Sequence, residues 1–265
     1  MDAFAAFKDL NDFALLLGLS ATRVSAAFLL VPLFTGELIP ALVRNALFMS
    51  IALLSVILQP APAPLLLSGV QWIAMFAKEV FIGGVIGFMF AGIMWAFEAA
   101  GQVIDMKVGT TQAQIMDPLS GHQTSLNGAF FGRLANFVFM AGGGFMIMIA
   151  TLFESYVLWP VRAPLPTLMA AGARVFESEF GRIMLLTLLI AAPALVLLYV
   201  VESVLGLINR FAQQLNVFSL SMSLKAVAAT LIILIQIVTL VQLLQEDLLG
   251  RGGIALQALR ALFGG

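Results

Sequence analysis

Long apolar runs separated by short polar segments dominate the chain. Six runs approach the length that crosses a bilayer, about 20 residues with a range of roughly 17 to 25. They are Phe13–Phe34, Ala46–Leu58, Val80–Phe97, Leu134–Phe153, Ile183–Val201 and Ala226–Leu244. Four meet that length cleanly, whereas the first holds Arg23 near its middle and the second is short and ends in "QPAPAP". The pattern predicts an all-α, membrane-associated chain of apolar helical hairpins with bent helices and no sheet, forming a single domain over residues 1–265.

Composition supports a membrane protein. Hydrophobic residues make up 62% of the 265 and charged residues 10%, and the mean hydropathy is +1.06. Soluble domains have about 45–50% apolar and about 25% charged residues. The formal net charge is −1 and Lys and Arg form no cluster, so nothing favours a nucleic-acid partner. Lys and Arg are spread nearly evenly over the loops on both sides, so the positive-inside rule assigns no orientation.

Small residues and helix breakers shape the predicted helices. Gly83, Gly87 and Ala91 fall at i, i+4 and i+8, on one helix face, where they allow a neighbouring helix to approach closely. That neighbour is either another helix of the same chain or a second subunit. The glycines within Ala141–Phe145 invite a bend, and Pro193 predicts a kink.

Arg23 stands near the middle of the first apolar run, where an unpaired arginine costs at least about 2.5–3.5 kcal/mol. Its candidate partners are Glu79, Glu98 and Asp105, among which the sequence does not choose. Lys78 precedes Glu79 and joins this set of predicted buried polar residues. The alternatives for Arg23 are a structural ion pair and a role in conduction, and we expect the ion pair.

Two polar stripes extend apolar runs. In each stripe the residues are spaced at i, i+4, i+7 and i+11, so they share one face if the helix continues past its apolar part. The stripes are Glu98, Gln102, Asp105 and Gly109, and Glu202, Gly206, Asn209 and Gln213. Such a stripe is typical either of a solvated helix end or of a helix that lines a wet passage.

The chain offers little for catalysis. It has no cysteine, and its single histidine, His122, lies in the polar segment "DPLSGHQTSLNG" without a carboxylate or serine at a recognised catalytic spacing. The glycines follow helical spacing rather than the strand–turn–helix spacing of a phosphate-binding loop. We therefore predict no catalytic residue, no cofactor, no bound metal and no enzymatic activity.

Residues 206–226, "GLINRFAQQLNVFSLSMSLKA", form a polar segment between the last two apolar runs. A hairpin between two spans needs only a few turn residues, yet this segment gathers amides and cations. They are Asn209, Arg210, Gln213, Gln214, Asn216 and Lys225. The segment therefore calls for an explanation beyond a plain connection.

The chain resembles the export-gate family that comprises flagellar FliR and its injectisome counterpart, the T component (SctT) of type III secretion. The resemblance runs through "RVSAAFLLVPLFTGELIPALVR", "KEVFIGG", "AAGQVIDMKVG" and Asp117–Pro118, and is most specific in "NRFAQQLNVFSLSMSLK". Members of the family often have proline where this chain has Gln213 and Ser223, which puts any turn geometry that depends on proline in doubt. "QQLNVF" with "SLSM" resembles the injectisome branch more closely than the flagellar one.

The resemblance implies a non-enzymatic subunit of the inner-membrane export gate, which helps to form and close a protein-conducting channel. Its implied partners are two smaller gate subunits, a switch (autoprotease) membrane subunit, unfolded secreted proteins and membrane lipid. The implied assembly is partly raised toward the periplasm. The segment 206–226 then becomes a tip at the channel entrance and a subunit joint. The residues assigned to it are Arg210, Gln213, Gln214, Asn216, Phe218 and Lys225.

Two other functions compete with this interpretation. A small-molecule or proton-coupled transporter would make use of broken helices and of intramembrane Arg23 and Asp105. Inverted repeats, which many transporters contain, are not evident in the sequence beyond the shared stripe spacing. A purely structural membrane scaffold is the second rival, and the conductance of the assembled complex would separate it from a gate subunit.

Overall fold

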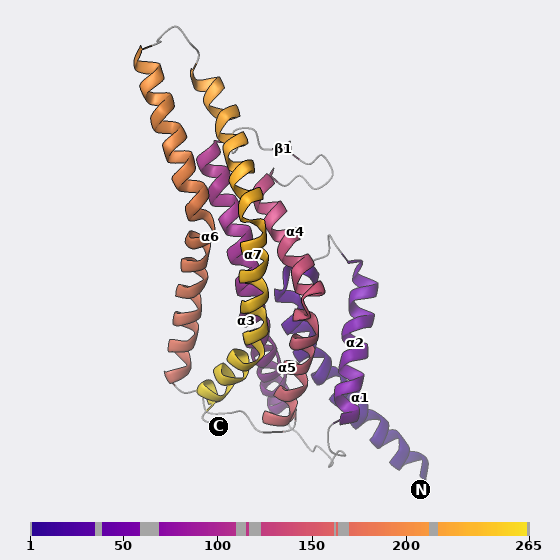
Figure 1. Ribbon diagram of the computed structural model, residues 1–265. Coiled ribbons are helices and arrows are strands. Elements are labelled where there is room, and N and C mark those ends of the chain that lie inside the picture. The colour runs from indigo at the N-terminus through magenta and orange to yellow at the C-terminus, as the bar shows by residue number, and fades with distance from the viewer. Residues whose placement is uncertain are drawn as a thin grey trace. The chain divides into compact units, whose positions relative to one another are not determined.

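The computed structural model of the protein describes residues 2–34, 39–58, 69–109, 115–116, 123–161, 163, 170–211 and 217–263 (Figure 1). Its helices are long and follow the apolar runs. In chain order they are α1 (Asp2–Leu30), the 3-10 helix η1 (Pro32–Phe34), α2 (Ala41–Leu58), α3 (Gly69–Val108), α4 (Leu126–Ala141), α5 (Gly144–Leu158), α6 (Ala170–Phe211) and α7 (Val217–Phe263). The prediction of an all-α chain is confirmed.

One strand pair lies between α3 and α4. β1 (Ile115–Met116) and β2 (Gln123–Thr124) pair antiparallel. The sequence predicted no sheet, and this pair is a small departure from that prediction. Strands of two residues fall below the usual length of about 3–10 residues, so the pair forms one local ladder and not a layer that could cover a core.

Four of the described helices are long and apolar enough to cross a membrane. The qualifying segments are Phe13–Leu30, Gln71–Val108, Arg174–Phe211 and Ser221–Leu262, and α4 with α5 qualifies as a broken pair. The apolar part of α2, Ala41–Ile57, is shorter. With 42 and 47 residues, α6 and α7 are about 63 and 70 Å long at 1.5 Å per residue. Both therefore exceed the roughly 30 Å of a hydrocarbon core.

The helix break predicted within Ala141–Phe145 is present. Helix α4 ends at Ala141, and the backbone N–H of Gly142 donates to the carbonyl of Val138 at 2.7 Å. Gly143 has φ +83°, a left-handed conformation that glycine adopts without the penalty of a Cβ atom. At Pro193, in contrast, α6 continues as one helix, so the kink expected there stays a prediction.

The described chain divides into two compact units, which we treat separately. Unit 1 comprises Met1–Ala91, Gly143–Glu179 and Leu248–Gly265. Within it, Phe28 stacks on Phe48 with ring centroids 5.4 Å apart and meets Phe34 edge-on at 4.8 Å. These rings join α1, η1 and α2 into one apolar cluster.

The small-residue strip of α3 also belongs to unit 1, and it packs against α1. A Cβ atom on Gly83 would collide with the backbone carbonyl of Arg23, and one on Gly87 with the backbone of Ala27. Ala91, the third residue of the strip, is fully buried. Of the two partners considered for this strip, a helix of the same chain therefore occupies the positions of Gly83 and Gly87.

Unit 2 comprises Gly92–Gly142 and Phe180–Asp247. Its core joins α3 to α4, where the rings of Phe97 and Phe131 meet at 6.3 Å and a Cβ on Gly101 would collide with the backbone of Asn127. In the same unit α6 and α7 run antiparallel beside each other (Figure 1). Thr187 of α6 donates a hydrogen bond to the carbonyl of Ala96 in α3 at 3.4 Å.

The long helices differ in how much of their apolar surface the chain itself covers. In its candidate span, α3 is 72% buried, whereas the spans of α6 and α7 are 33% and 22% buried. Exposed side chains on these two helices include Leu188, Phe211 and Ile235. Apolar faces of this length need a covering of lipid or protein, so α6 and α7 each present a long surface available to either.

Candidate functional site

A buried ion pair joins α1 to α3 in unit 1. The guanidinium of Arg23 donates through Nε to Oε2 of Glu79 at 2.6 Å and through Nη2 to Oε1 at 3.1 Å. Both side chains are fully buried. This two-pronged geometry is the strongest arrangement for an arginine and a carboxylate, and Gly83 helps to create it because the strip lets the two backbones approach.

Helix α5 completes the surroundings of Arg23. Nη1 donates to Oγ of Ser155 at 3.1 Å, and Nη2 also donates to the carbonyl of Trp159 at 2.9 Å. The ring of Tyr156 lies beneath the guanidinium, 4.2 Å from Cζ to the ring centroid, while its hydroxyl donates to the carbonyl of Ser20. Because α5 ends at Leu158, the carbonyl of Trp159 lies past the last helical residue, where it accepts from Arg23.

Lys78 brings a second buried cation to the same carboxylate. Its Nζ lies 3.2 Å from Oε1 of Glu79 and donates to the carbonyls of Pro160, Val161 and Ala163 at 3.2, 2.7 and 3.0 Å. One carboxylate thus faces two cations, and backbone carbonyls from the non-helical segment after α5 provide the remaining acceptors. The sequence placed Lys78 in a buried polar set, but it gave no signal for these carbonyl partners.

Of the three carboxylates considered for Arg23, the structure places Glu79 against it. Glu98 and Asp105 belong to unit 2. Glu98 is half-buried and accepts a hydrogen bond from Nε2 of Gln102 at 3.4 Å, one turn along α3. These two carboxylates therefore serve other contacts.

Asp105 fastens the start of α4. Its Oδ2 accepts from the hydroxyl of Ser125 and from the backbone N–H of Asn127 at 2.9 Å, and its Oδ1 accepts from Nδ2 of Asn127 at 2.6 Å. Ser125 is the N-cap residue, and its Oγ accepts from the N–H of Gly128 at 3.0 Å. A carboxylate near a helix N-terminus also complements the helix dipole. Asp105 therefore ties the end of α3 to the beginning of α4.

A second cluster of charges joins three helices in unit 2. Glu202 of α6 contacts the ammonium of Lys107 in α3 through Oε2 and that of Lys225 in α7 through Oε1, the latter at 3.2 Å. Lys107 also lies 3.9 Å above the ring of Tyr199. The Glu202 side chain is 47% exposed. The sequence assigned Glu202 to a polar stripe and Lys225 to the tip, but it did not pair them.

Two further ion pairs between α6 and α7 escaped the sequence analysis. Fully buried Arg251 donates through Nη1 to Glu179 at 2.5 Å in unit 1. Arg182 donates to Asp247 at 2.6 Å in unit 2. Along each helix the charges alternate in sign one turn apart, and this spacing is the signal from which the pairs could have been suspected.

For most of the residues assigned to the tip, the structure does not describe the side chain. Gln213, Gln214 and Asn216 belong to residues 212–216, which the structure does not describe, and neither does it describe the side chain of Phe218. Arg210 is exposed in the last turn of α6. The lone histidine, His122, also lies outside the described residues.

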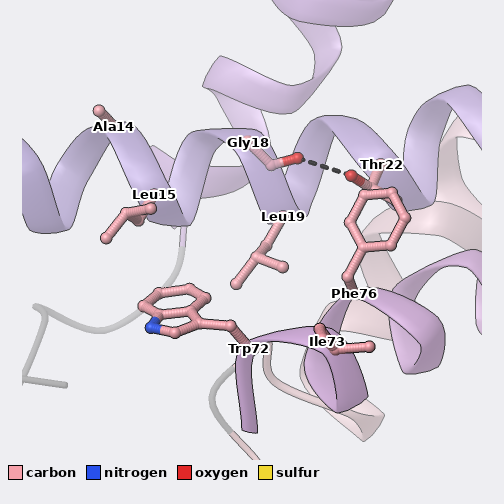
Figure 2. Close-up of a pocket in the computed structure, with 8 residues that line it drawn as sticks. All are labelled: Ala14, Leu15, Gly18, Leu19, Thr22, Trp72, Ile73 and Phe76. Atoms are coloured by element: carbon pink, nitrogen blue, oxygen red, sulfur yellow. Dashed lines mark hydrogen bonds between the residues drawn. The ribbon is translucent and has the colours of Figure 1, made fainter. Parts of the chain in front are cut away.

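An apolar hollow of about 510 Å³ lies between α1 and α3 in unit 1 (Figure 2). Leu19, Trp72 and Phe76 line it beside the backbone of Gly18, and none of its lining residues is titratable. Oγ1 of Thr22 donates to the carbonyl of Gly18 at 2.9 Å, so this hydroxyl is already bonded. The hollow can accommodate apolar groups but presents no acid, base or nucleophile. Nor do three or more His, Cys, Asp or Glu residues gather as metal ligands within the described ranges.

Fold and sites together define a membrane-associated helical protein whose internal charges fix helices to one another and whose longest helices keep apolar faces uncovered. Residues 14–250 match the model of the family described as "Bacterial export proteins, family 1". The chain belongs to this family.

Curated relatives come from several bacteria. Yop proteins translocation protein T of Yersinia pestis is 33% identical over 217 residues, which cover 80% of this chain and 82% of the relative. Secretion system apparatus protein SsaT of Salmonella typhimurium is 32% identical over 233 residues, 86% of this chain and 89% of the relative. Flagellar biosynthetic protein FliR of Bacillus subtilis is 27% identical over 216 residues, 80% and 82%.

Proposed function

We propose that this protein is a non-catalytic subunit of the inner-membrane export gate of a type III secretion system, where it helps to form and close the protein-conducting channel. The observation that carries the proposal is the family match over residues 14–250, together with relatives named for translocation, secretion and flagellar biosynthesis. The match extends over both units, so the proposal concerns the whole helical framework and not one isolated motif.

The uncovered faces of α6 and α7 support a role within an assembly. Each helix is longer than the hydrocarbon core of a bilayer. On α6, exposed apolar side chains continue as far as Val204 and Phe211. Lipid alone would leave part of such a face in water. Two smaller gate subunits of the same system are the proposed covering, in an assembly that is partly raised toward the periplasm.

The proposed mechanism is passive. Unfolded substrate would pass through a channel that apolar side chains close at rest and that rearranged helices open, with energy supplied elsewhere in the machine. The polar segment 206–226 would form the entrance, where the switch membrane subunit and the secreted proteins arrive. Exposure of Arg210 at the end of α6 is compatible with that position.

A proton-coupled or small-molecule transporter gains less support from the geometry. The donors of Arg23 are occupied by Glu79, Ser155 and the Trp159 carbonyl. Asp105 is engaged with the N-terminus of α4. Each of the two charges that a transporter would use therefore has a structural task.

Deleting the gene and complementing it with the tagged chain tests the proposal. Secretion should be lost on deletion and restored on complementation, and the tagged chain should copurify with two smaller apolar gate subunits. Conductance of the purified complex distinguishes a gate subunit from a scaffold. A stable monomer that supports secretion without these subunits would contradict the proposal.

The entrance role has its own test, the double variant Gln214→Ala, Asn216→Ala. A buried amide that loses its partner costs about 1–3 kcal/mol, so a joint built from these amides should weaken. We expect loss of secretion at normal membrane levels of the chain, measured together with recovery of the complex. The exposed Ser203→Ala serves as the control. Normal secretion from the double variant would return the segment to the role of a connection.

A further inference from the structure

The charged cluster of unit 2 has an arrangement that suits a reversible contact. One carboxylate, Glu202, binds two ammonium groups that come from different helices, Lys107 near the end of α3 and Lys225 near the start of α7. Removing Glu202 would leave two like charges and break both connections at once. The three helices therefore share a single central residue at this end of unit 2.

The partial exposure of the cluster makes its contacts weak. The side chains of Glu202, Lys107 and Lys225 are 47%, 23% and 12% exposed. Ion pairs that reach solvent are screened and contribute little individually. Contacts of this strength can be broken and formed again without unfolding the helices that carry them.

Packing between α6 and α7 is incomplete beside the same cluster. An apolar hollow of about 380 Å³ lies between the two helices, and its walls include Val201 and Val204 on either side of Glu202 in sequence, and Leu224 next to Lys225. Most of the side chains that line this hollow are exposed, among them Val204, Leu224 and Val227, so it is open on one side. Along this stretch the ion pairs therefore accompany an apolar contact between α6 and α7 that is only partly covered.

We propose that Glu202 is the centre of an ionic latch, formed with Lys107 and Lys225, that holds α6 and α7 together and against the end of α3. Resting on the proposed function, the latch is closed in the closed gate and is released when the channel opens. The hollow provides the space into which side chains of α6 and α7 move once the latch is released. The ring of Tyr199 keeps Lys107 close to α6 during that movement.

A single introduced thiol reports on the latch. The chain contains no cysteine, and Ala228, which lines the hollow, is replaced in the variant Ala228→Cys. Its rate of labelling by a membrane-permeant maleimide is measured in membranes that contain the assembled secretion system. Adding Glu202→Gln should speed labelling about fivefold, which corresponds to about 1 kcal/mol. Equal rates with and without Glu202→Gln would overturn the latch.

Glu246→Gln is the matched control, because Glu246 is exposed on α7 in the same unit and forms no ion pair with the residues that the structure describes. It should leave the labelling rate unchanged. Lys225→Gln should speed labelling by itself, and adding it to Glu202→Gln should have little further effect, since the two residues act through one contact. Fully additive effects would overturn the latch.

The role in opening is measured separately, as ion leak through the gate in the same membranes. Glu202→Gln should raise the leak severalfold over Glu246→Gln. Faster labelling with an unchanged leak would overturn the role in opening. None of these outcomes decides the proposed function, which depends on loss of secretion after deletion and on copurification with the gate subunits.

Discussion

The two charge clusters each combine one glutamate with two cations, but they differ in how far they are buried. In unit 1, Glu79 faces Arg23 and Lys78, and in unit 2, Glu202 faces Lys107 and Lys225. The chain's two tyrosines each lie beneath one of these cations, Tyr156 under Arg23 and Tyr199 under Lys107. The Glu79 side chain is fully buried, however, whereas that of Glu202 is 47% exposed.

Burial decides what the same set of charges can do. A buried pair that loses one partner leaves an uncompensated charge, at a cost of about 3–5 kcal/mol, whereas an exposed pair contributes about 0–1 kcal/mol. The cluster of unit 1 also has backbone carbonyls and Ser155 as partners, which hold the charges in one geometry. The ion pairs of Glu79 therefore hold the helices of unit 1 in one arrangement, whereas those of Glu202 in unit 2 can separate and form again.

The largest effect should follow Arg23→Leu. Glu79 would then remain buried beside Lys78 alone, so we expect the chain to lose about 3–5 kcal/mol of stability and to fail in assembly. Membrane levels and recovery of the complex measure this loss. Arg133→Leu is the control, because Arg133 is exposed. Normal assembly of Arg23→Leu would show that the buried pair is dispensable.

Removing every charge of the unit 1 cluster sharpens the comparison. The triple variant Arg23→Met, Lys78→Met, Glu79→Leu leaves no buried charge without a partner, and buried ion pairs replaced by apolar residues of similar size are often tolerated. The carbonyls of Pro160, Val161 and Ala163 lose their donor. We expect the triple variant to recover part of the assembly that Arg23→Leu loses. A triple variant worse than the single one would show that these charges are needed for more than pairing with one another.

Gly83→Ala should have the next largest effect. Its Cβ would meet the carbonyl of Arg23 and push α1 away from α3, and overpacking of this kind typically costs about 1–3 kcal/mol. The neighbouring Gly84→Ala is a matched control, since no atom lies within 4 Å of the position of its added Cβ. Thermal unfolding in detergent should separate the two variants. Equal midpoints would show that the close approach of α1 is unimportant.

Asp105→Ala should destabilise unit 2 by a smaller amount. It removes the acceptor of Ser125 and Asn127 at the start of α4, and loss of a helix cap costs about 0.5–2 kcal/mol. Hydrogen exchange of the first turn of α4 is the suitable measurement, and that turn should exchange faster. Asp105→Asn retains one carbonyl acceptor, so its exchange rate should fall between those of the unaltered protein and Asp105→Ala. Unchanged exchange in this turn would show that Asp105 does not stabilise the start of α4.

Salt should produce the smallest effect and should distinguish the clusters directly. At 1 M salt the screening length is about 3 Å, so the labelling of Ala228→Cys should rise toward the rate seen with Glu202→Gln. In the Glu202→Gln background the rate should respond little to salt. The destabilisation caused by Gly83→Ala should also change little with salt, because the neighbouring Arg23–Glu79 pair is buried and inaccessible to ions. An equal response of both clusters to salt would contradict the difference inferred between the exposed cluster of unit 2 and the buried cluster of unit 1.

From the sequence we could predict that a buried charge needs a partner of opposite charge, but not which residue that partner is. Apolar runs fixed the helices, and a mid-run Arg23 required a carboxylate for a reason that holds in any fold. The choice of Glu79 over Glu98 and Asp105 depends on which helix faces lie together, and helical spacing within one segment does not carry that information.

Contacts to the backbone were beyond prediction for a different reason. The carbonyls that bind Lys78 belong to a non-helical segment, and every residue has a carbonyl, so no side-chain pattern reveals the site. The charges of α6 and α7, in contrast, were visible as residues, but Glu202 has two candidate helices within reach. Pairing such charges requires knowledge of the hairpin and of the end of α3.

The three carbonyl acceptors of Lys78 have a consequence for the folding of the protein during its synthesis. Pro160, the first of them, follows Lys78 by 82 residues, which a ribosome adds in about 4–16 s at about 5–20 residues per second. Throughout that interval Glu79 is available to the lysine but the carbonyls are not. We therefore expect the hydrogen bonding of Lys78 to be completed only after the segment that follows α5 has been synthesised.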